Sequence, residues 1–163
     1  MEVKGGFAII ELVMVIAVIG ILAALSIPAF QEMGQIRRQT ARQKMIQDIR
    51  YARSFAIAQR ETIGVTISPS AESYSVYRNN PSNIITHPAD RKPFTVNFQT
   101  HLDFQGVGID STTLSGNVVK FDALGTPSDA AGEFNANTTH QIVLSGGSLT
   151  TTIKIFAETG MVQ

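Results

Sequence analysis

An apolar run near the start of the chain, from Phe7 to Phe30, constrains the fold more than any other feature. Glu11 is its only charged residue and Ser26 its only hydroxyl-bearing residue. A helix of this length extends about 36 Å, which exceeds the roughly 30 Å hydrocarbon core of a bilayer. The run therefore predicts a transmembrane helix over residues 7–30, with some tilt.

A secretory signal peptide also contains an apolar run, but its parts follow a different order. A basic segment comes first, then about 7–15 apolar residues, then small residues at the cleavage site. Here the run is longer, the small residues Gly5 and Gly6 precede it, and the charge of Glu11 lies inside it. The sequence therefore favours a different kind of N-terminal segment.

Gly6, Phe7 and Glu11, followed by an unbroken apolar span, resemble the leader of type IV pilins and type II secretion pseudopilins. The resemblance implies that a prepilin peptidase cleaves after Gly6, which removes residues 1–6, and that Phe7 becomes an N-methylated terminus. It also implies that Glu11 pairs with the terminal amine of Phe7 on a neighbouring subunit during assembly. The alternative is that Glu11 only lies at the cytoplasmic interface, where the positive end of the helix dipole stabilises it.

Gly20 and Pro28 are the two helix-weakening residues within the span. Proline removes an intrahelical hydrogen bond and kinks a helix. The resemblance implies that the segment between these two residues loosens in the filament. The alternative is that Pro28 only marks the end of the membrane-spanning part.

The helix is predicted to continue through residues 31–60, because residues 31–59 contain no proline and mostly good helix formers. Apolar residues recur there every three or four positions, which places them on one face. They are Ala41, Met45, Ile49, Ala52 and Ala56. We expect this face to pack on a sheet. Five polar residues of this segment fall largely outside that face and are expected to be solvated. They are Arg38, Gln39, Arg42, Gln43 and Arg50.

Basic residues are concentrated in the same segment, although the formal net charge of the whole chain is +0. They are Arg37, Arg38, Arg42, Lys44, Arg50, Arg53 and Arg60. This basic belt either contacts acidic neighbours or lipid headgroups, or forms a solvated helix face. The positive-inside rule alone would place the C-terminal body in the cytoplasm. The resemblance implies the opposite topology, with a single pass through the inner membrane, a cytoplasmic N-terminus and a periplasmic head.

Beyond residue 61 the hydrophobic pattern alternates with a period of two, which predicts strands. The predicted strands are residues 63–67, 74–77, 94–98, 114–121, 140–144 and 149–156, with a long loop over residues 78–92. Gly106, Val107 and Gly108 are interpreted as a turn. Together these elements predict an α+β fold, in which the long helix packs on a small antiparallel β-rich head at residues 61–163.

Three stretches outside the leader resemble the GspH/FimT group of minor pseudopilins. They are residues 49–57, 119–127 and 153–160. The resemblance implies a sandwich-like β head against the C-terminal half of the helix, and it does not cover residues 68–115. Many type IV pilins close a C-terminal loop with a disulfide, which this chain cannot form because it contains no cysteine.

No catalytic residue, metal site or cofactor is expected. His87, His101 and His140 are far apart in sequence and lack the spacing of metal ligands, so each is interpreted as a surface or loop histidine. Three acidic residues near Gly125 do not match a calcium-binding loop and are interpreted as solvated. They are Asp122, Asp129 and Glu133.

These features predict a membrane-anchored minor pseudopilin of a type II secretion pseudopilus. The alternative is a minor subunit of a type IV pilus, in pilus assembly or DNA uptake. Expected partners are other pilin or pseudopilin subunits, the prepilin peptidase, an inner-membrane assembly platform and, before assembly, the lipid bilayer. Nucleic acid is an unlikely partner, because duplex binding needs clustered exposed Lys and Arg, whereas the head is acidic on balance and has no basic residue after Ala157.

Overall fold

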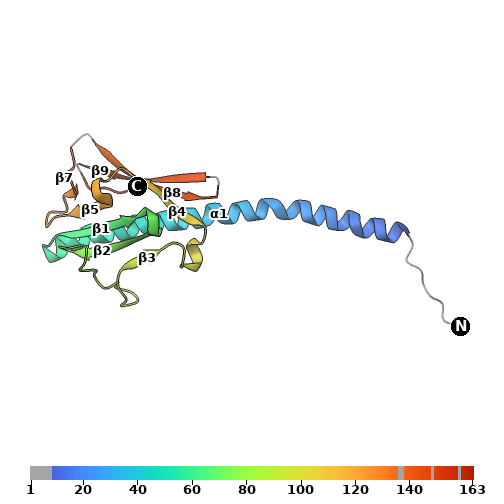
Figure 1. Cartoon of the computed structure of the whole chain (residues 1–163), viewed down its shortest axis with the longest axis horizontal. Helices are drawn as coiled ribbons and strands as arrows, with labels where there is room; N and C mark the ends of the chain where they lie inside the picture. The colour runs from blue at the N-terminus through green and yellow to red at the C-terminus, as the bar shows by residue number, and fades with distance from the viewer. Residues whose placement is uncertain (1–8, 136–137, 148, 158) are drawn as a thin grey trace. The chain divides into compact units, whose positions relative to one another are not determined.

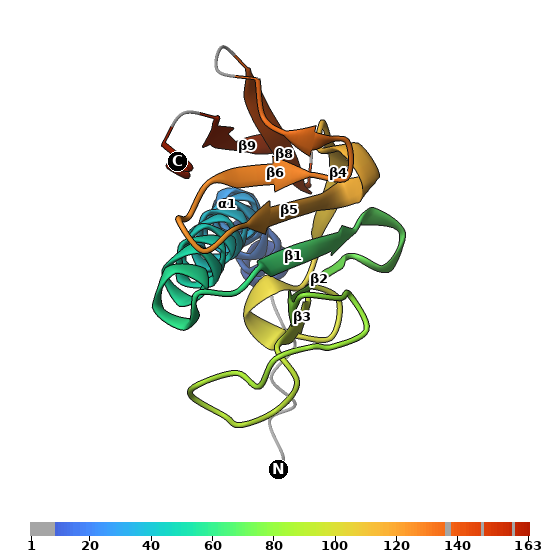
Figure 2. The same cartoon turned by 90° about the vertical axis from the view of Figure 1, so that its left-hand side faces the viewer.

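The computed structural model describes residues 9–135, 138–147, 149–157 and 159–163, and for residues 24–32 it describes the helical backbone alone. The chain divides into two compact units, Met1–Met33 and Gly34–Gln163. Helix α1 (Ile9–Gln59) begins in the first unit and ends in the second. The second unit carries all the described strands; Figure 1 labels most of them, and β6 is labelled in Figure 2.

Two antiparallel sheets make up the β part of the second unit. The larger sheet has the order β3-β2-β1-β5-β6-β7. Its strands are β1 (Ile63–Ser68), β2 (Ser73–Arg78), β3 (Thr95–Asn97), β5 (Val118–Phe121), β6 (Pro127–Asp129) and β7 (Gly132–Glu133). The smaller sheet has the order β4-β8-β9, with β4 (Val107–Thr112), β8 (Thr139–Gly146) and β9 (Leu149–Phe156). Short 3-10 turns η1 (Pro69–Ala71), η2 (Leu102–Phe104) and η3 (Ser115–Asn117) connect them.

The C-terminal part of α1 packs on both sheets through one apolar stripe. Ala41, Met45, Ile49, Ala52 and Ala56 are each 0% exposed, as the spacing predicted. They share one core with apolar side chains of both sheets, and Figure 2 shows strands of both sheets beside α1. The predicted fold class, a long helix on an antiparallel β-rich head, is confirmed.

Three strands were missed by the hydrophobic pattern. Val107 and Gly108, interpreted as part of a turn, begin β4, and only Gly106 has the left-handed backbone of a turn, with φ of 82°. Strand β4 also has an irregular register between Ile109 and Ser111, which interrupts the alternation. Strands β6 and β7 are short, so pairing with β5 and with each other defines them more than their side chains do.

Helix α1 ends in a left-handed residue that is not glycine. Arg60 has φ of 56°, and the Glu61 N–H donates to the carbonyl of Ala56 at 3.3 Å. This pattern matches a Schellman C-cap with arginine at the position where glycine is usual. Because Arg60 has a Cβ atom, its left-handed conformation costs about 1 kcal/mol of folding free energy.

The predicted membrane span extends at both ends beyond the residues whose side chains are described. Among the residues that the structure does describe, no helical stretch is both long enough and apolar enough to cross a membrane. The span at residues 7–30 therefore stays a prediction.

Candidate functional site

The first part of α1 exposes large apolar side chains on every side. From Ile9 to Leu22, the large aliphatic residues have exposed fractions between 48% and 82%. A helix that is apolar all round needs a covering, either lipid or other protein. Glu11 is the acidic residue of the first helical turn, where the helix dipole favours a carboxylate. No ion pair to Glu11 is found within the described part of the chain.

The other residues predicted from the leader resemblance lie partly outside the described residues. Gly6 and Phe7 lie outside the described residues, and so does the predicted pairing of Glu11 with a Phe7 amine. Gly20 is helical, and a methyl group built on it would meet no atom within 4 Å. Pro28 lies within the backbone of α1, and its side chain is outside the described set. The roles of all these residues stay predictions.

The basic belt is used largely within the chain, which corrects the prediction that Arg38 and Arg42 are solvated; Arg50 is exposed, as predicted, although it also bonds within the chain. Arg38 is 5% exposed and donates from Nη1 to the carbonyls of Gly146 at 2.8 Å and Leu149 at 3.3 Å. Other arginines of α1 bond to backbone carbonyls in the same way. The pairs are Arg37 with Gln105 at 3.3 Å, Arg42 with Thr152 at 3.2 Å, Arg50 with Val162 at 2.7 Å and Arg53 with Gly125 at 3.1 Å. Gln39 and Gln43 are exposed, as predicted.

All of these bonds except that of Arg37 attach the helix to the chain's C-terminal third. Arg38 and Arg42 reach the hairpin of β8 and β9, while Arg50 reaches the segment that follows it. Hydrogen bonds to a charged donor contribute about 1.5–3 kcal/mol each, less where solvent reaches them. The arginines therefore hold the small sheet against α1, alongside the apolar stripe.

A buried polar group links α1 to the larger sheet. The Asp48 carboxylate accepts from the Tyr74 hydroxyl at 2.6 Å and from Lys44 Nζ at 2.6 Å. Burial, and secondarily the charge and hydrogen bond of Asp48, raise the pKa of Tyr74 well above its ordinary value of 10.0. The phenol therefore stays protonated and donates to Asp48 throughout the neutral pH range.

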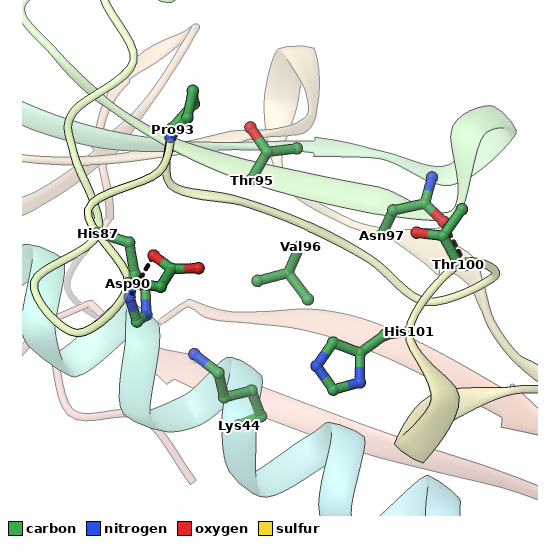
Figure 3. A pocket seen from close by; sticks show the side chains of 9 residues that line it. All are labelled: Lys44, His87, Asp90, Pro93, Thr95, Val96, Asn97, Thr100 and His101. Atoms are coloured by element: carbon green, nitrogen blue, oxygen red, sulfur yellow. Dashed lines mark hydrogen bonds and ion pairs between the residues drawn. The ribbon is translucent and has the colours of Figure 1, made fainter.

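A pocket of about 280 Å³ lies beside Lys44 and the edge strand β3. Figure 3 shows Lys44, His87 and His101 facing the same space below Val96. Its lining is His87, Asp90, Pro93, Thr95, Val96, Asn97, Thr100, His101 and Lys44. The charges here already have partners in the chain, because Lys44 pairs with Asp48, and His87 Nδ1 lies 3.3 Å from Asp90.

The three histidines, each interpreted from the sequence as a surface or loop residue, lie in two different surroundings. His87 and His101, 14 positions apart in sequence, line the same pocket. His140 lies on β8 and stacks on Phe134, with ring centroids 3.9 Å apart. Considering only described residues, no three His, Asp or Glu side chains are grouped as metal ligands.

The acidic residues near Gly125 are not all solvated. Asp129 is buried, and its two carboxylate oxygens accept from the Ser115 N–H at 3.0 Å and the Ala131 N–H at 2.8 Å. Asp122 accepts at Oδ1 from the N–H groups of Leu124 and Thr126, each at 2.8 Å. Both carboxylates therefore stabilise turns, and the prediction of a solvated loop was wrong for Asp129.

Comparison with known families identifies the chain. The family model described as "Type II transport protein GspH" matches residues 41–157, which is most of the second unit. The chain belongs to the GspH family. The match includes the arginine-bearing helix segment from Arg42 to Arg53 and the hairpin of β8 and β9.

Solved structures and sequence relatives of this GspH-family chain include both secretion and pilus proteins. The minor pseudopilin EpsH of the Vibrio cholerae type 2 secretion system has a TM-score of 0.55 at 11% identity, covering 78% of this chain and 94% of EpsH. The type IV minor pilin FimU of Pseudomonas aeruginosa has a TM-score of 0.52 at 18% identity, covering 82% and 90%. These likenesses show the shared fold.

Two fimbrial proteins of Pseudomonas aeruginosa are each 32% identical to the chain over 76 residues, which is 47% of this chain and 49% of theirs. The chain therefore spans about half the length of these curated relatives. Their similarity does not separate a secretion subunit from a pilus subunit.

Sequence reasoning missed the structural role of the arginines. A usable signal existed, because Arg38, Arg42 and Arg53 each lie three positions before a residue of the buried stripe. Residues three apart on a helix are neighbours, so these arginines had to lie at the border of the packed face. Their backbone partners could not be found, since those partners are 72 to 111 positions further along the chain.

Proposed function

We propose that this GspH-family chain is a structural subunit of a pilin-type filament and performs no catalysis. The observation that supports the proposal most is the first part of α1, an exposed helix that is apolar all round and carries one carboxylate, Glu11. Lipid covers this segment before assembly, and the corresponding helices of neighbouring subunits cover it afterwards. The head then remains in the periplasm.

Glu11 is the proposed register residue of assembly. A carboxylate in the membrane costs about 2.5–3.5 kcal/mol at mid-span and less near an end. Pairing with the amine of Phe7 on a neighbouring subunit offsets this cost only when the two helices are in the correct register. Glu11 therefore disfavours a misplaced subunit, and it gives the assembled filament a defined stagger.

Glu11→Ala is the test of this role. We expect membrane insertion and leader removal as in the unaltered chain, with loss of incorporation into filaments. The measurement is co-sedimentation of the full chain with sheared filaments, and Glu11→Asp is the matched control that keeps the charge. Normal incorporation of Glu11→Ala would contradict the proposal.

Processing at Gly6 is a separate part of the proposal. The prepilin peptidase needs a small residue there to approach the backbone, so Gly6→Leu should accumulate as an uncleaved precursor in the inner membrane. Gly5→Leu is the neighbouring control and should still be cleaved. A C-terminal reporter that is active in the cytoplasm would contradict the proposed topology, in which the head is periplasmic.

We place the subunit in a type II secretion pseudopilus, supported by the family description and by the likeness to EpsH. The second candidate is a type IV pilus, favoured by the likeness to FimU and to the fimbrial proteins. Deletion of the gene distinguishes them. Loss of a secreted enzyme from the medium with normal pili supports the first, and loss of pili with normal secretion supports the second.

A further inference from the structure

Three exposed aliphatic residues lie around α1 at the end of the head that this helix enters. They are Ile36, Leu102 and Leu149, with exposed fractions of 64%, 77% and 46%. Each comes from a different element, namely α1, η2 and the first position of β9. In Figure 1, η2 (yellow) and the end of β8 lie at this end of the head. We call the three residues the collar.

Two hydrogen bonds from α1 place the collar residues at one level along the helix. Arg37 donates to the carbonyl of Gln105, three positions after Leu102. Arg38 donates to the carbonyl of Leu149 itself. These arginines directly follow the collar residue of α1, near the start of the second unit. The collar therefore forms the edge of the head.

The collar residues lie on different sides of α1. Consecutive helix positions differ by about 100° around the axis. Positions 36, 37 and 38 therefore direct the collar isoleucine, the contact with the η2 segment and the contact with β9 to three sides. The strand order β4-β8-β9 agrees, because β8 separates β9 from β4, the strand that follows η2. The collar thus encircles the helix and is not a patch on one side of it.

The collar carries little net charge. Among the described residues next to it in sequence, Arg37 and Asp103 have opposite charges. The others are polar, namely Gln35, His101 and Thr150. A polyanionic partner needs clustered exposed lysine and arginine, which these positions do not supply. The collar therefore favours a partner that covers aliphatic side chains without needing a charge of one sign.

The predicted span limits what fits against the collar. With Glu11 at one edge of a hydrocarbon core of roughly 30 Å, about 20 helical residues bring the other edge close to Gln31. Ile36 then lies about 8 Å beyond that edge, which is close to the thickness of the headgroup layer. A folded partner does not fit there, since even one helix is about 10 Å across. A bilayer surface crossed by α1, in contrast, meets all sides of the collar at once.

We propose that the collar rests on the headgroup layer of a zwitterionic phospholipid bilayer before assembly. This contact rests on the proposed function, because it requires α1 to be anchored in the membrane. Ile36, Leu102 and Leu149 lose apolar area to water when they enter the interface, which favours the contact. Contacts on three sides of α1 hold the head upright on the membrane. Entry into a filament then requires the collar to leave the lipid.

Tryptophan fluorescence tests the contact, because the chain contains no tryptophan of its own. Leu102→Trp and Leu149→Trp each place a reporter in the collar of the full chain, reconstituted in phosphatidylcholine vesicles. Leu124→Trp is the matched control. Leu124 is 82% exposed and lies near the other end of α1, since its neighbour Gly125 bonds to Arg53. Phosphatidylcholine brominated in the upper acyl chain should quench both collar reporters at least about twofold more than the control.

A second set of variants tests whether the aliphatic side chains cause the contact. In the Leu149→Trp reporter, Leu102→Glu should remove at least about half of the quenching, because a carboxylate is costly to bury in the interface. Leu102→Ser adds no charge and should weaken the quenching in the same direction. Leu124→Glu is the control and should leave it unchanged. High salt should also leave it unchanged, since the contact is apolar.

The outcomes separate this inference from the proposed function. Quenching of the collar reporters that is no stronger than that of Leu124→Trp overturns the inference, and so does quenching that Leu102→Glu and Leu102→Ser leave intact. Loss of the quenching in high salt overturns it as well, because the contact would then be electrostatic. A carbonate wash tests the proposed anchor separately. Release of the chain from the vesicles contradicts the proposed function, whereas retention without collar quenching overturns the inference alone.

Discussion

The two parts of helix α1 are both rich in apolar residues, yet they are stabilised in opposite ways. From Ile9 to Leu22 the large aliphatic side chains are at least 48% exposed, whereas the stripe from Ala41 to Ala56 is 0% exposed. The first part has apolar residues on all sides, and the second confines them to one face and places arginines beside it. The first part is thus built for an environment outside the single chain, and the second for the chain's own sheets.

The two parts of α1 also differ in their arginines. Arginine is long enough to pass beside an apolar stripe and bond to carbonyls beyond it. On the second part of α1, Arg42 donates to the carbonyl of Thr152 in β9, an edge strand of the smaller sheet. The first part has no such residue between Ile9 and Leu22, so it has no polar means of docking on a head.

The largest effect on stability is expected from a substitution in the buried apolar stripe of the second part of α1. Ile49→Ala should lower the free energy of unfolding of the head by about 2–5 kcal/mol, because Ile49 is fully buried among α1 and both sheets. Ile16→Ala, the same change on an exposed position, should alter head unfolding by less than about 0.5 kcal/mol. Urea denaturation of the full chain in detergent, followed by tyrosine circular dichroism, measures both. Equal effects would show that the two parts are not stabilised differently.

A smaller effect is expected from the arginines. Arg38→Ala should cost about 1–3 kcal/mol, because the carbonyls of Gly146 and Leu149 lose a charged donor in a buried place. Gln39→Ala, next to it on the exposed face, is the control and should be within about 0.5 kcal/mol of the unaltered chain. The same denaturation experiment applies. A neutral Arg38→Ala would mean that water replaces the guanidinium without loss.

High pH tests the buried contact between the second part of α1 and β2. The pKa of Tyr74 is raised, so below pH 10 the phenol is protonated in both states and its contribution to stability is complete. Above that pH the unfolded chain loses the proton first, and stability falls by up to about 1.4 kcal/mol per pH unit. Tyr74→Phe should flatten this decline in thermal melts between pH 9 and 11. Part of it should remain, because burial also raises the pKa of Tyr77.

The smallest expected effect is at the end of the helix. Arg60→Gly should raise the free energy of unfolding by up to about 1 kcal/mol, because glycine adopts the left-handed conformation of position 60 without steric cost. Gln59→Gly, one position earlier in α1, should lower it by about 0.5–1 kcal/mol. A decrease for Arg60→Gly would mean that the arginine side chain stabilises the head by more than its backbone costs.

Much of the fold follows from local patterns. The spacing of Ala41, Met45, Ile49 and Ala52 by four, four and three positions fixes which face of the helix packs, because helix geometry is regular. The alternation in residues 139–156 likewise predicts the last hairpin, whose turn contains Gly147 with φ of 66°. Strand β4 could not be found in this way. Its pairing with β8 links residues 30 or more positions apart, and an irregular register breaks its alternation.

The candidate sites divide in a similar way. Glu11 is conspicuous in the sequence, since a single charge in an apolar run is improbable without a role. The pocket lined by Arg50 and Arg53 was not, because these two residues look like ordinary residues of a solvated helix face. Only the return of residues 159–162 to α1 makes a groove of them.

The sequence by itself thus determined the long helix, its packed stripe, the β-rich head and the resemblance to pilin-like subunits. These features depend on the order of side chains over a few residues, and such order is visible along a chain. The tertiary structure decided where the arginines bond, which histidines share a pocket and where exposed charge remains. Those depend on contacts between residues distant in sequence, which no local pattern specifies.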